Sequence, residues 1–254
     1  MAEKLKLGVF KFASCDGCQL AVIRAVEQLP LFITENVDIR YFAEATDTKL
    51  PGPYDLALVE GSVSVPEHIE RVKQIREQSK LMVTIGACAT AGGIQSLRNW
   101  GSMKEFSDIV YKRPEWIESL EKSTPISEHV KLDYEIQGCP INETYLIDLM
   151  ASLFSGKRPR IERQSVCIQC KRLGNICVLV GKGLPCMGPV TVAGCGALCP
   201  SYRRDCYSCF GPMEEINPDS LKNKFKEIGL EDYEIQHKFR EFTGFSRRFR
   251  EVDV

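Results

Sequence analysis

The stretch LKLGVFKFASCDGCQL (residues 5–20) carries an apolar run directly into two closely spaced cysteines. Residues 5–12 read as a β-strand, and residues 18–29 place apolar side chains at helical spacing. Cys15 and Cys18 therefore lie where a strand passes into a helix. Such a pair can be a redox disulfide, half of a zinc site or half of a larger centre, and the other ten cysteines decide among these.

Outward from this stretch, the first 155 residues alternate between strand and helix patterns. Further strands are predicted at 37–44, 54–61, 80–88 and 131–140. Helices are predicted at 65–78, with Ser64 as cap and Pro66 at the start, and at 142–155, capped by Asn142. This alternation predicts an α/β fold with a flavodoxin-like, doubly wound parallel sheet.

The pattern changes after about residue 160. Residues 167–209 hold eight cysteines among many glycines and prolines, with little apolar periodicity. Such a segment predicts an irregular Cys-rich domain that metal ligation helps to hold together. The sequence therefore divides into a flavodoxin-like domain (1–160), a Cys-rich domain (161–212) and a helical tail (213–254).

The composition narrows the function class. The 254 residues carry a net charge of −1, which points to neither nucleic acid nor an anionic membrane as a partner. The charge-free stretches 81–97 and 183–202 are not expected to span a membrane, since prolines and glycines interrupt the second. No signal peptide or twin-arginine leader is recognisable, so we expect a cytoplasmic protein.

Twelve cysteines is a high number for a compartment that keeps thiols reduced, so metal binding outranks disulfides. Cys15, Cys18, Cys88 and Cys139 all fall at the carboxyl ends of predicted strands or just beyond, and such ends share one edge of a parallel sheet. These four thiols are therefore expected to converge. Glu60 ends a strand at the same edge, either beside the site or in solvent. Nearby glycines would let the backbone approach an inorganic core: Gly17, Gly86, Gly92, Gly93 and Gly138.

Other uses of these thiols explain the positions of the four cysteines less well. A thioredoxin-like pair at residues 15–18 would leave Cys88 and Cys139 without a role. A zinc ion could take four thiolates, but zinc ribbons draw their ligands from paired knuckles rather than from separate sheet ends. Buried inert thiols are common, but three placements at strand ends argue against chance.

The second eight cysteines form two compact groups, Cys167, Cys170, Cys177 and Cys186, then Cys195, Cys199, Cys206 and Cys209. Four thiolates suit a structural zinc ion or a 4Fe–4S cluster. Three clusters in one chain make sense as a path for single electrons. The sequence has no G-x-G-x-x-G and no Walker A motif, so a nucleotide or flavin would bind elsewhere.

The motifs resemble those of the small subunit of NiFe hydrogenases, above all of the cytoplasmic multimeric branch with the sulfhydrogenase delta subunit and NADP-coupled enzymes. They are SCDGCQL (14–20), LVEGS (58–62), TIGACATAGG (84–93), GCP (138–140), PCMGPVTVAGCGALCP (185–200) and CYSCFGP (206–212). The resemblance covers about residues 5–212, in order and at suitable spacing.

The resemblance implies an electron-transfer subunit with three 4Fe–4S clusters. Its proximal cluster would lie on Cys15, Cys18, Cys88 and Cys139, its distal cluster on Cys167, Cys170, Cys177 and Cys186, and its medial cluster on Cys195, Cys199, Cys206 and Cys209. The NiFe centre would belong to a large subunit, and iron–sulfur and flavin subunits would pass electrons to NAD(P). Better-known relatives carry histidine at the place of Cys167 and proline near Cys199, so thiolate ligation at both places favours three four-iron clusters here.

Three alternatives stay open. A methanogen-type hydrogenase would pass electrons to a deazaflavin or a heterodisulfide reductase. The cluster-bearing subunit of respiratory complex I resembles only residues 5–155 and uses adjacent cysteines. A zinc-stabilised interaction protein would use the same thiolates but would be colourless. The histidines His68, His129 and His237 match no ligand position and are expected on the surface or in loops.

Overall fold

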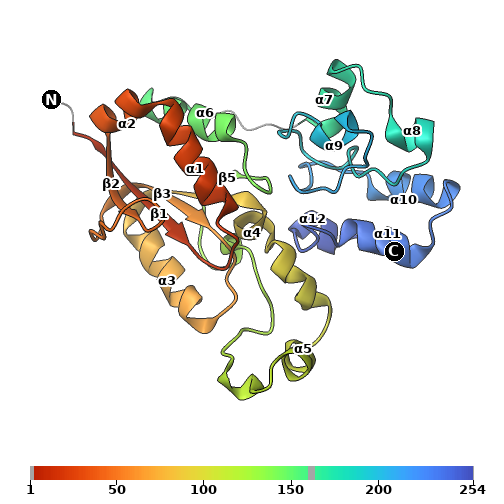
Figure 1. The fold of residues 1–254 in the computed structure, drawn as a ribbon, viewed down its shortest axis with the longest axis horizontal. Helices are drawn as coiled ribbons and strands as arrows, with labels where there is room; N and C mark the ends of the chain where they lie inside the picture. Colours follow the sequence, from red (N-terminus) through yellow and green to blue (C-terminus); the bar gives the residue numbers. More distant parts are fainter. Residues whose placement is uncertain (1–2, 160–163, 254) are drawn as a thin grey trace.

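The first half of the chain folds into a parallel sheet covered by helices on both faces (Figure 1). The computed structural model describes residues 3–159 and 164–253. The strands are β1 (Leu5–Lys11), β2 (Val37–Phe42), β3 (Tyr54–Glu60), β4 (Ser79–Ile85) and β5 (Tyr134–Ile136). They are ordered β2-β1-β3-β4-β5, and all neighbouring pairs are parallel. The predicted α/β fold is confirmed, and this strand order is flavodoxin-like.

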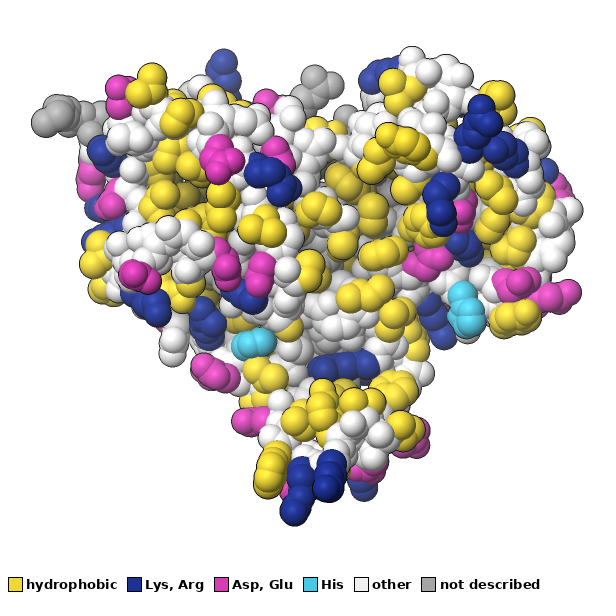
Figure 2. Space-filling view, in the orientation of Figure 1, with side chains coloured by type: hydrophobic (Ala, Val, Ile, Leu, Met, Phe, Trp, Pro, Cys, Tyr) yellow, Lys and Arg dark blue, Asp and Glu magenta, His cyan; other side chains and the backbone are white. Residues whose placement is uncertain are grey.

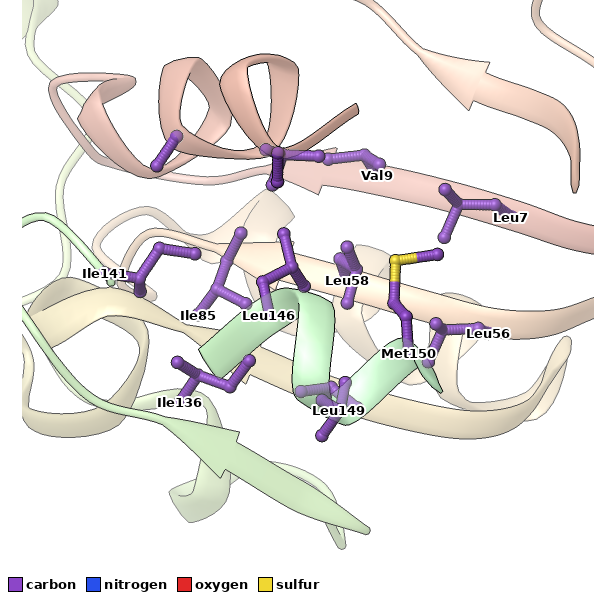
Figure 3. Packing of buried hydrophobic residues seen from close by; sticks show 14 of the residues in the cluster. Leu7, Val9, Leu56, Leu58, Ile85, Ile136, Ile141, Leu146, Leu149 and Met150 are labelled. Carbon is purple, nitrogen blue, oxygen red and sulfur yellow. The ribbon is translucent and has the colours of Figure 1, made fainter. Parts of the chain in front are cut away.

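Alternating side chains of the strands form two separate cores. The helices of this half are α1 (Gly17–Gln28), α2 (Pro30–Asn36), α3 (Pro66–Glu77), α4 (Gly86–Ala91), α5 (Met103–Val110) and α6 (Glu143–Phe154), with 3₁₀ turns η1 (Ile94–Trp100), η2 (Pro114–Trp116) and η3 (Ile126–Glu128). On one face, Leu146 and Met150 of α6 point toward Leu58 and its neighbours in the sheet (Figure 3). On the other face, Val72 of α3 packs against the opposite side of the strands. A sheet buried on both faces holds its carboxyl edge rigidly.

Two strands end three or more residues earlier than predicted. β4 ends at Ile85, because Gly86 adopts a φ of 87° and the chain turns into α4. Cys88 therefore lies in a helix and not at the end of a strand. The predicted strand 131–140 is reduced to the three residues of β5, so Cys139 lies in the turn that follows. Before β5, the Asp133 carboxylate accepts the N–H of Met82 (2.8 Å), where a longer strand would offer a backbone carbonyl.

Helix ends agree with the sequence at one predicted cap and differ at the other. The Asn142 side chain caps α6 by accepting the N–H of Thr144 (2.9 Å), as predicted. The prediction that Ser64 caps α3 was wrong. The helix begins at Pro66 after Val65, and the backbone N–H of Ser64 donates to Nδ1 of His68 instead. Helices α2, α4 and α5 were not predicted.

The second half forms a lobe beside the sheet (Figure 1). Its helices are α7 (Val166–Arg172), α8 (Val178–Lys182), α9 (Leu198–Ser201), α10 (Pro218–Glu227), α11 (Asp232–Phe239) and α12 (Arg247–Arg250). Val178 and Met187 of the Cys-rich part share one core with Phe225, Ile235 and Phe239 of the tail. The tail therefore supplies the apolar surface that residues 167–209 lack. The division of the chain near residues 160 and 212 stays a prediction.

The histidines differ in part from expectation. His68 lies within α3 and is partly buried against the ring of Phe12, so it is neither in a loop nor fully exposed. His129 is partly buried and bonded to Thr124, while His237 is exposed on α11. Within the described ranges, none of the helices has the length and apolar character that a bilayer crossing requires.

Candidate functional site

The first four cysteines of the predicted site come from four separate segments at one edge of the sheet. Cys15 follows β1, and Cys18 lies in the first turn of α1. Cys88 lies in α4 directly after β4, and Cys139 lies in the turn after β5. The carboxyl ends of β1, β4 and β5 carry these segments, as the parallel order requires.

These four thiols influence one another electrostatically. Burial raises the pKa of Cys88 to about 11, and negative charge on Cys139 and Cys15 adds to the rise. Burial also raises the pKa of Cys18, with further contributions from Glu60, Cys88 and Cys139. Contacts between the segments that carry them agree with this: the N–H of Ala87 donates to the carbonyl of Gly138 (2.7 Å), and a Cβ on Gly17 would lie 3.5 Å from Sγ of Cys15 and 3.7 Å from Cβ of Pro140. A bound metal overcomes this preference for the protonated form, because coordination deprotonates a thiol.

Two glycines let the backbone press against this group. A Cβ atom on Gly86 would collide with Sγ of Cys18, and a Cβ on Gly93 would lie 2.6 Å from Sγ of Cys88. Both glycines have positive φ, at 87° and 67°. Any other residue would push the sulfurs out of place, so the backbone here is shaped to leave room only for the thiols and what they bind.

Glu60 lies beside the site and not in solvent. Only 1% of the residue is exposed, and its Oε1 accepts the backbone N–H of Cys18 (3.1 Å). Its Oε2 is buried and receives no hydrogen bond from a described residue. Burial raises the pKa of this carboxyl, and the nearby Gln19 amide and the N–H of Cys18 partly offset the rise. The solvent-exposed alternative is therefore wrong.

Gln95 of η1 is a neighbour of the site that the sequence did not reveal. Its Oε1 lies 3.7 Å from Sγ of Cys88, and its Nε2 donates to the carbonyl of Ala13 (2.7 Å) and to Oγ of Ser62 (2.8 Å). The amide thus ties η1 to the segments that follow β1 and β3. No sequence pattern marks it, because it lies in the irregular stretch between α4 and β5.

The last four cysteines line a cavity of about 330 Å³. They are Cys195, Cys199, Cys206 and Cys209, and Cys139 of the first group lies in the same wall. Burial raises the pKa of Cys209 to about 12, and negative charge on Cys195 and Cys139 adds to the rise. The cavity therefore adjoins the first group of thiols directly.

The third group, Cys167, Cys170, Cys177 and Cys186, gathers around α7 and the start of α8. Burial raises the pKa of Cys167 to about 11. Negative charge on Cys186, Cys170 and Cys177 adds to the rise. The backbone N–H of Cys206 donates to Sγ of Cys186 (3.3 Å). This bond connects the third group to the cavity-lining group, so the three sets form a continuous series.

The donor chemistry of each set suits an iron–sulfur cluster. Each set offers four thiols, and thiolates are the usual cluster ligands. Backbone N–H groups reach the sulfurs of Cys186 and Cys206, the kind of contact that tunes cluster potentials. Among the described residues, no three His, Cys, Asp or Glu side chains are arranged to hold a single metal ion.

Comparison with known proteins covers both halves of the chain. Residues 15–153 match the family described as NADH ubiquinone oxidoreductase, 20 Kd subunit. The chain is 35% identical to the sulfhydrogenase 2 subunit delta of Pyrococcus furiosus, over 94% of this chain and 99% of that protein. It is 29% identical to a subunit of the F420-non-reducing hydrogenase of Methanococcus voltae, over 97% and 96% of the two chains.

Among solved structures, a chain of an NAD⁺-reducing [NiFe]-hydrogenase in the H2-reduced state is similar, with a TM-score of 0.57 and 27% identity. The match covers 63% of this chain and 96% of that chain. The family match includes only the first four cysteines, whereas the two relatives extend over the Cys-rich half as well.

Proposed function

Because this chain belongs to the NADH ubiquinone oxidoreductase 20 Kd subunit family and is a small subunit of the NiFe hydrogenase type, we propose that it holds three 4Fe–4S clusters. The proposed ligands are Cys15, Cys18, Cys88 and Cys139 (proximal), Cys195, Cys199, Cys206 and Cys209 (medial), and Cys167, Cys170, Cys177 and Cys186 (distal). The observation that carries the proposal is that the segments bearing the first four cysteines all follow the carboxyl ends of parallel strands at one edge of the sheet.

The proximal set would face the hydrogenase large subunit, which carries the NiFe centre. Cys15 and Cys139 are exposed in the isolated chain, although the sheet that positions them is buried on both faces. An exposed ligand at a rigid edge suits a surface that a partner covers. This chain binds no nickel in the proposal, since no histidine follows Cys206-x2-Cys209 at ligand spacing.

The order proximal, medial, distal rests on two links. Cys139 of the proximal set lines the medial cavity, and the N–H of Cys206 in the medial set donates to Cys186 in the distal set. Iron–sulfur clusters supply single-electron transfer when bound. The residues of the chain fix the spacing between the sets, keep water away from the buried thiols and aim N–H groups at the sulfurs.

We propose that the electrons pass between the large subunit and iron–sulfur and flavin subunits that react with NAD(P), in the cytoplasm. Support comes from the relatives, since one of the similar structures belongs to an NAD⁺-reducing hydrogenase. A methanogen-type acceptor is the second candidate, because a subunit of an F420-non-reducing hydrogenase matches 97% of the chain. The genes beside this one would decide between the two acceptors.

Metal analysis of the purified complex tests the cluster assignment. We expect about twelve irons per small subunit and a broad visible absorbance, since cluster ligation uses four thiolates for each cube. Zinc in place of iron, in a colourless protein, would support the zinc-stabilised interaction protein instead.

Substitution of a proximal ligand tests its role. Cys15→Ser is expected to lower the iron content by about four per chain and to abolish H2 turnover, while the nickel of the large subunit stays in place. The neighbouring substitution Ser14→Ala is the matched control and should keep the full iron content. Unchanged benzyl-viologen-linked H2 oxidation in Cys15→Ser would argue against the assignment.

A further inference from the structure

Gln95 presents its amide oxygen, and not its amide nitrogen, to a thiol of the proximal set. Oε1 lies 3.7 Å from Sγ of Cys88. Gly93 leaves room for this contact, because an added Cβ there would lie 2.6 Å from Sγ of Cys88 and 2.8 Å from Oε1 of Gln95. The sulfur and the oxygen therefore share one small space over the backbone of Gly93.

Two acceptors decide the direction of this amide. Nε2 of Gln95 donates to the carbonyl oxygen of Ala13 (2.7 Å) and to Oγ of Ser62 (2.8 Å). A rotated amide would set its own oxygen 2.7 Å from the carbonyl of Ala13, where two acceptors face each other without a proton between them. The amide nitrogen therefore cannot turn toward Cys88 without losing both bonds.

The two acceptors are themselves held in place. Ala13 and Ser62 form an antiparallel bridge, with N–H to oxygen distances of 3.2 and 3.0 Å. Oγ of Ser62 also contacts Oγ of Ser123 (2.8 Å), and both serines are fully buried. A buried and satisfied polar network rigidifies the groups that it includes. The side-chain carbonyl of Gln95 is therefore a fixed dipole.

The other two sets show the reverse arrangement. The backbone N–H of Cys206 donates to Sγ of Cys186 (3.3 Å), and the N–H of Ser208 donates to Sγ of Cys206 (3.5 Å). Within the proximal set, the backbone N–H of Ile141 reaches the sulfur of Cys18. N–H groups at the sulfurs favour the reduced, more negative form of an iron–sulfur cluster, and a carbonyl oxygen disfavours it. The side-chain carbonyl thus acts in the opposite direction.

The charged side chains at this edge of the sheet are paired or buried. Lys11 and Asp16 form an ion pair (2.5 Å), and Glu60 is buried. Figure 1 places α4 on the side of the sheet that faces the second lobe, and Figure 2 shows mostly apolar and uncharged side chains on the surface between the lobes. A dipole in contact with a sulfur is weakly screened in such surroundings, because screening needs water or mobile charge.

We propose that Gln95 is a positioning residue that keeps the reduction potential of the proximal cluster low, by holding its amide oxygen against the sulfur of Cys88. The inference rests on the proposed function, since it takes Cys88 as a ligand of that cluster. An added electron places more negative charge on the ligand sulfurs, and the negative end of the amide dipole opposes it. An electron is therefore held less tightly at this position than it would be beside an apolar side chain.

The potential of the proximal cluster in the iron-loaded complex of both subunits tests the inference. Gln95→Leu removes the amide dipole and keeps an apolar side chain in its place, and Gln95→Met is the second variant, with a longer chain. In both, the midpoint potential should rise by about 59 mV, a tenfold change in the one-electron equilibrium constant. Potentiometric titration followed by electron paramagnetic resonance measures it, and the proximal signal is the one that Cys15→Ser removes.

Asn99→Leu is the matched control in η1. The amide of Asn99 also makes two bonds to a neighbouring segment, since it donates to the carbonyl of Ser123 (2.8 Å) and accepts the N–H of the same residue (2.8 Å). The control should lower the thermal unfolding temperature comparably to Gln95→Leu and leave the proximal potential unchanged. An equal rise of the potential in Asn99→Leu would overturn the inference, because a loosened η1 and not the dipole would be its cause.

The remaining outcomes separate the inference from the proposed function. Full iron content with an unchanged or lowered proximal potential in both Gln95 variants would overturn the role of the amide and leave the proposed function intact. A loss of about four irons in both Gln95 variants, but not in Asn99→Leu, would also overturn it and assign Gln95 to retention of the cluster. A wild-type complex without iron would refute the proposed function itself.

Discussion

Nδ2 of Asn142 donates to the carbonyl oxygen of Gly194 over 2.6 Å, and this bond joins the two lobes next to the thiols. The same side chain caps α6 through Oδ1, which accepts the N–H of Thr144. Cys139 lies shortly before Asn142 in the chain, and Cys195 follows Gly194 directly. One amide therefore holds the proximal set in register with the medial set.

Substitutions of Asn142 separate its two roles. Asn142→Ala loses the cap and the bond to Gly194 and should lower the free energy of unfolding by about 2 kcal/mol. Asn142→Asp keeps the capping oxygen but loses the donor, so it should cost about 1 kcal/mol. Denaturant unfolding of the two variants checks this. Wild-type stability in Asn142→Asp would mean that the bond between the lobes contributes nothing.

Gly86→Ala should displace Sγ of Cys18 in the proximal set, in addition to straining the left-handed backbone at residue 86. Gly229 is the matched control, because its φ of 94° is close to the 87° of Gly86 and no atom lies within 4 Å of its added Cβ. Both alanine variants should lose roughly 1–2 kcal/mol of stability to the left-handed backbone. Only Gly86→Ala also drives a methyl into Cys18, so only this variant should lose about four irons per chain. Equal iron content in both variants would contradict the close packing.

Lys238 is expected to stabilise the Cys-rich lobe strongly. Its Nζ lies 2.8 Å from Asp205 and 3.0 Å from Glu241, and its side chain is only 16% exposed. Lys238→Met would leave two facing carboxylates and should cost about 3 kcal/mol of unfolding free energy. Lys224→Met, which breaks the more exposed pair with Glu227, should cost about 0.5 kcal/mol or less. Similar losses in both variants, measured by denaturant unfolding, would show that burial adds nothing to the Lys238 pair.

The sequence predicted the sheet, and the placement of the first four cysteines at one edge of it, because both depend on short-range patterns. Buried parallel strands read as continuous apolar runs, and their ends share one edge whatever the loops do. The exact position of Cys88 was not predictable, since the backbone of Gly86 ends β4 three residues early. Gln95 was missed for a different reason, because its contacts to Ala13 and Ser62 depend on a loop path that no periodicity records.

The role of the tail was also hidden in the sequence. The apolar content of residues 167–209 is low, which predicted that metal ligation holds them together. The structure adds a second source of stability, since Phe225 and Phe239 close a core over Val178 and Met187. Helical periodicity revealed the tail helices, but it could not show which surface they cover.

Phe225→Ala tests this second source of stability. The side chain is fully buried in the core shared by tail and Cys-rich part, so its removal should cost about 4 kcal/mol. Tyr233→Ala, on the exposed surface of α11, is the control and should change stability by about 0.5 kcal/mol or less. Thermal unfolding of the iron-loaded complex measures both. A negligible effect of Phe225→Ala would mean that the metal centres alone hold the lobe together.

Glu135 should make stability depend on pH. It lies in β5 beside Thr84 of β4, and burial raises the pKa of its carboxyl. Because the folded state binds this proton more tightly than the unfolded state, the stabilisation is full below the unfolded pKa and is lost as the pH rises through the raised pKa. Glu135→Gln cannot ionise, so its stability relative to wild type should improve as the pH rises from the unfolded pKa through the raised pKa, and should stay level below and above this range.

Denaturant unfolding at several pH values measures this difference, with the exposed Glu77→Gln as control. Glu77 is exposed on α3, so the control reports what a Glu→Gln exchange does outside the sheet. Since the raised pKa comes from burial in the sheet, a constant difference between Glu135→Gln and wild type would mean that the carboxyl of Glu135 is hydrated in the folded protein, and that the β5 edge is open to water.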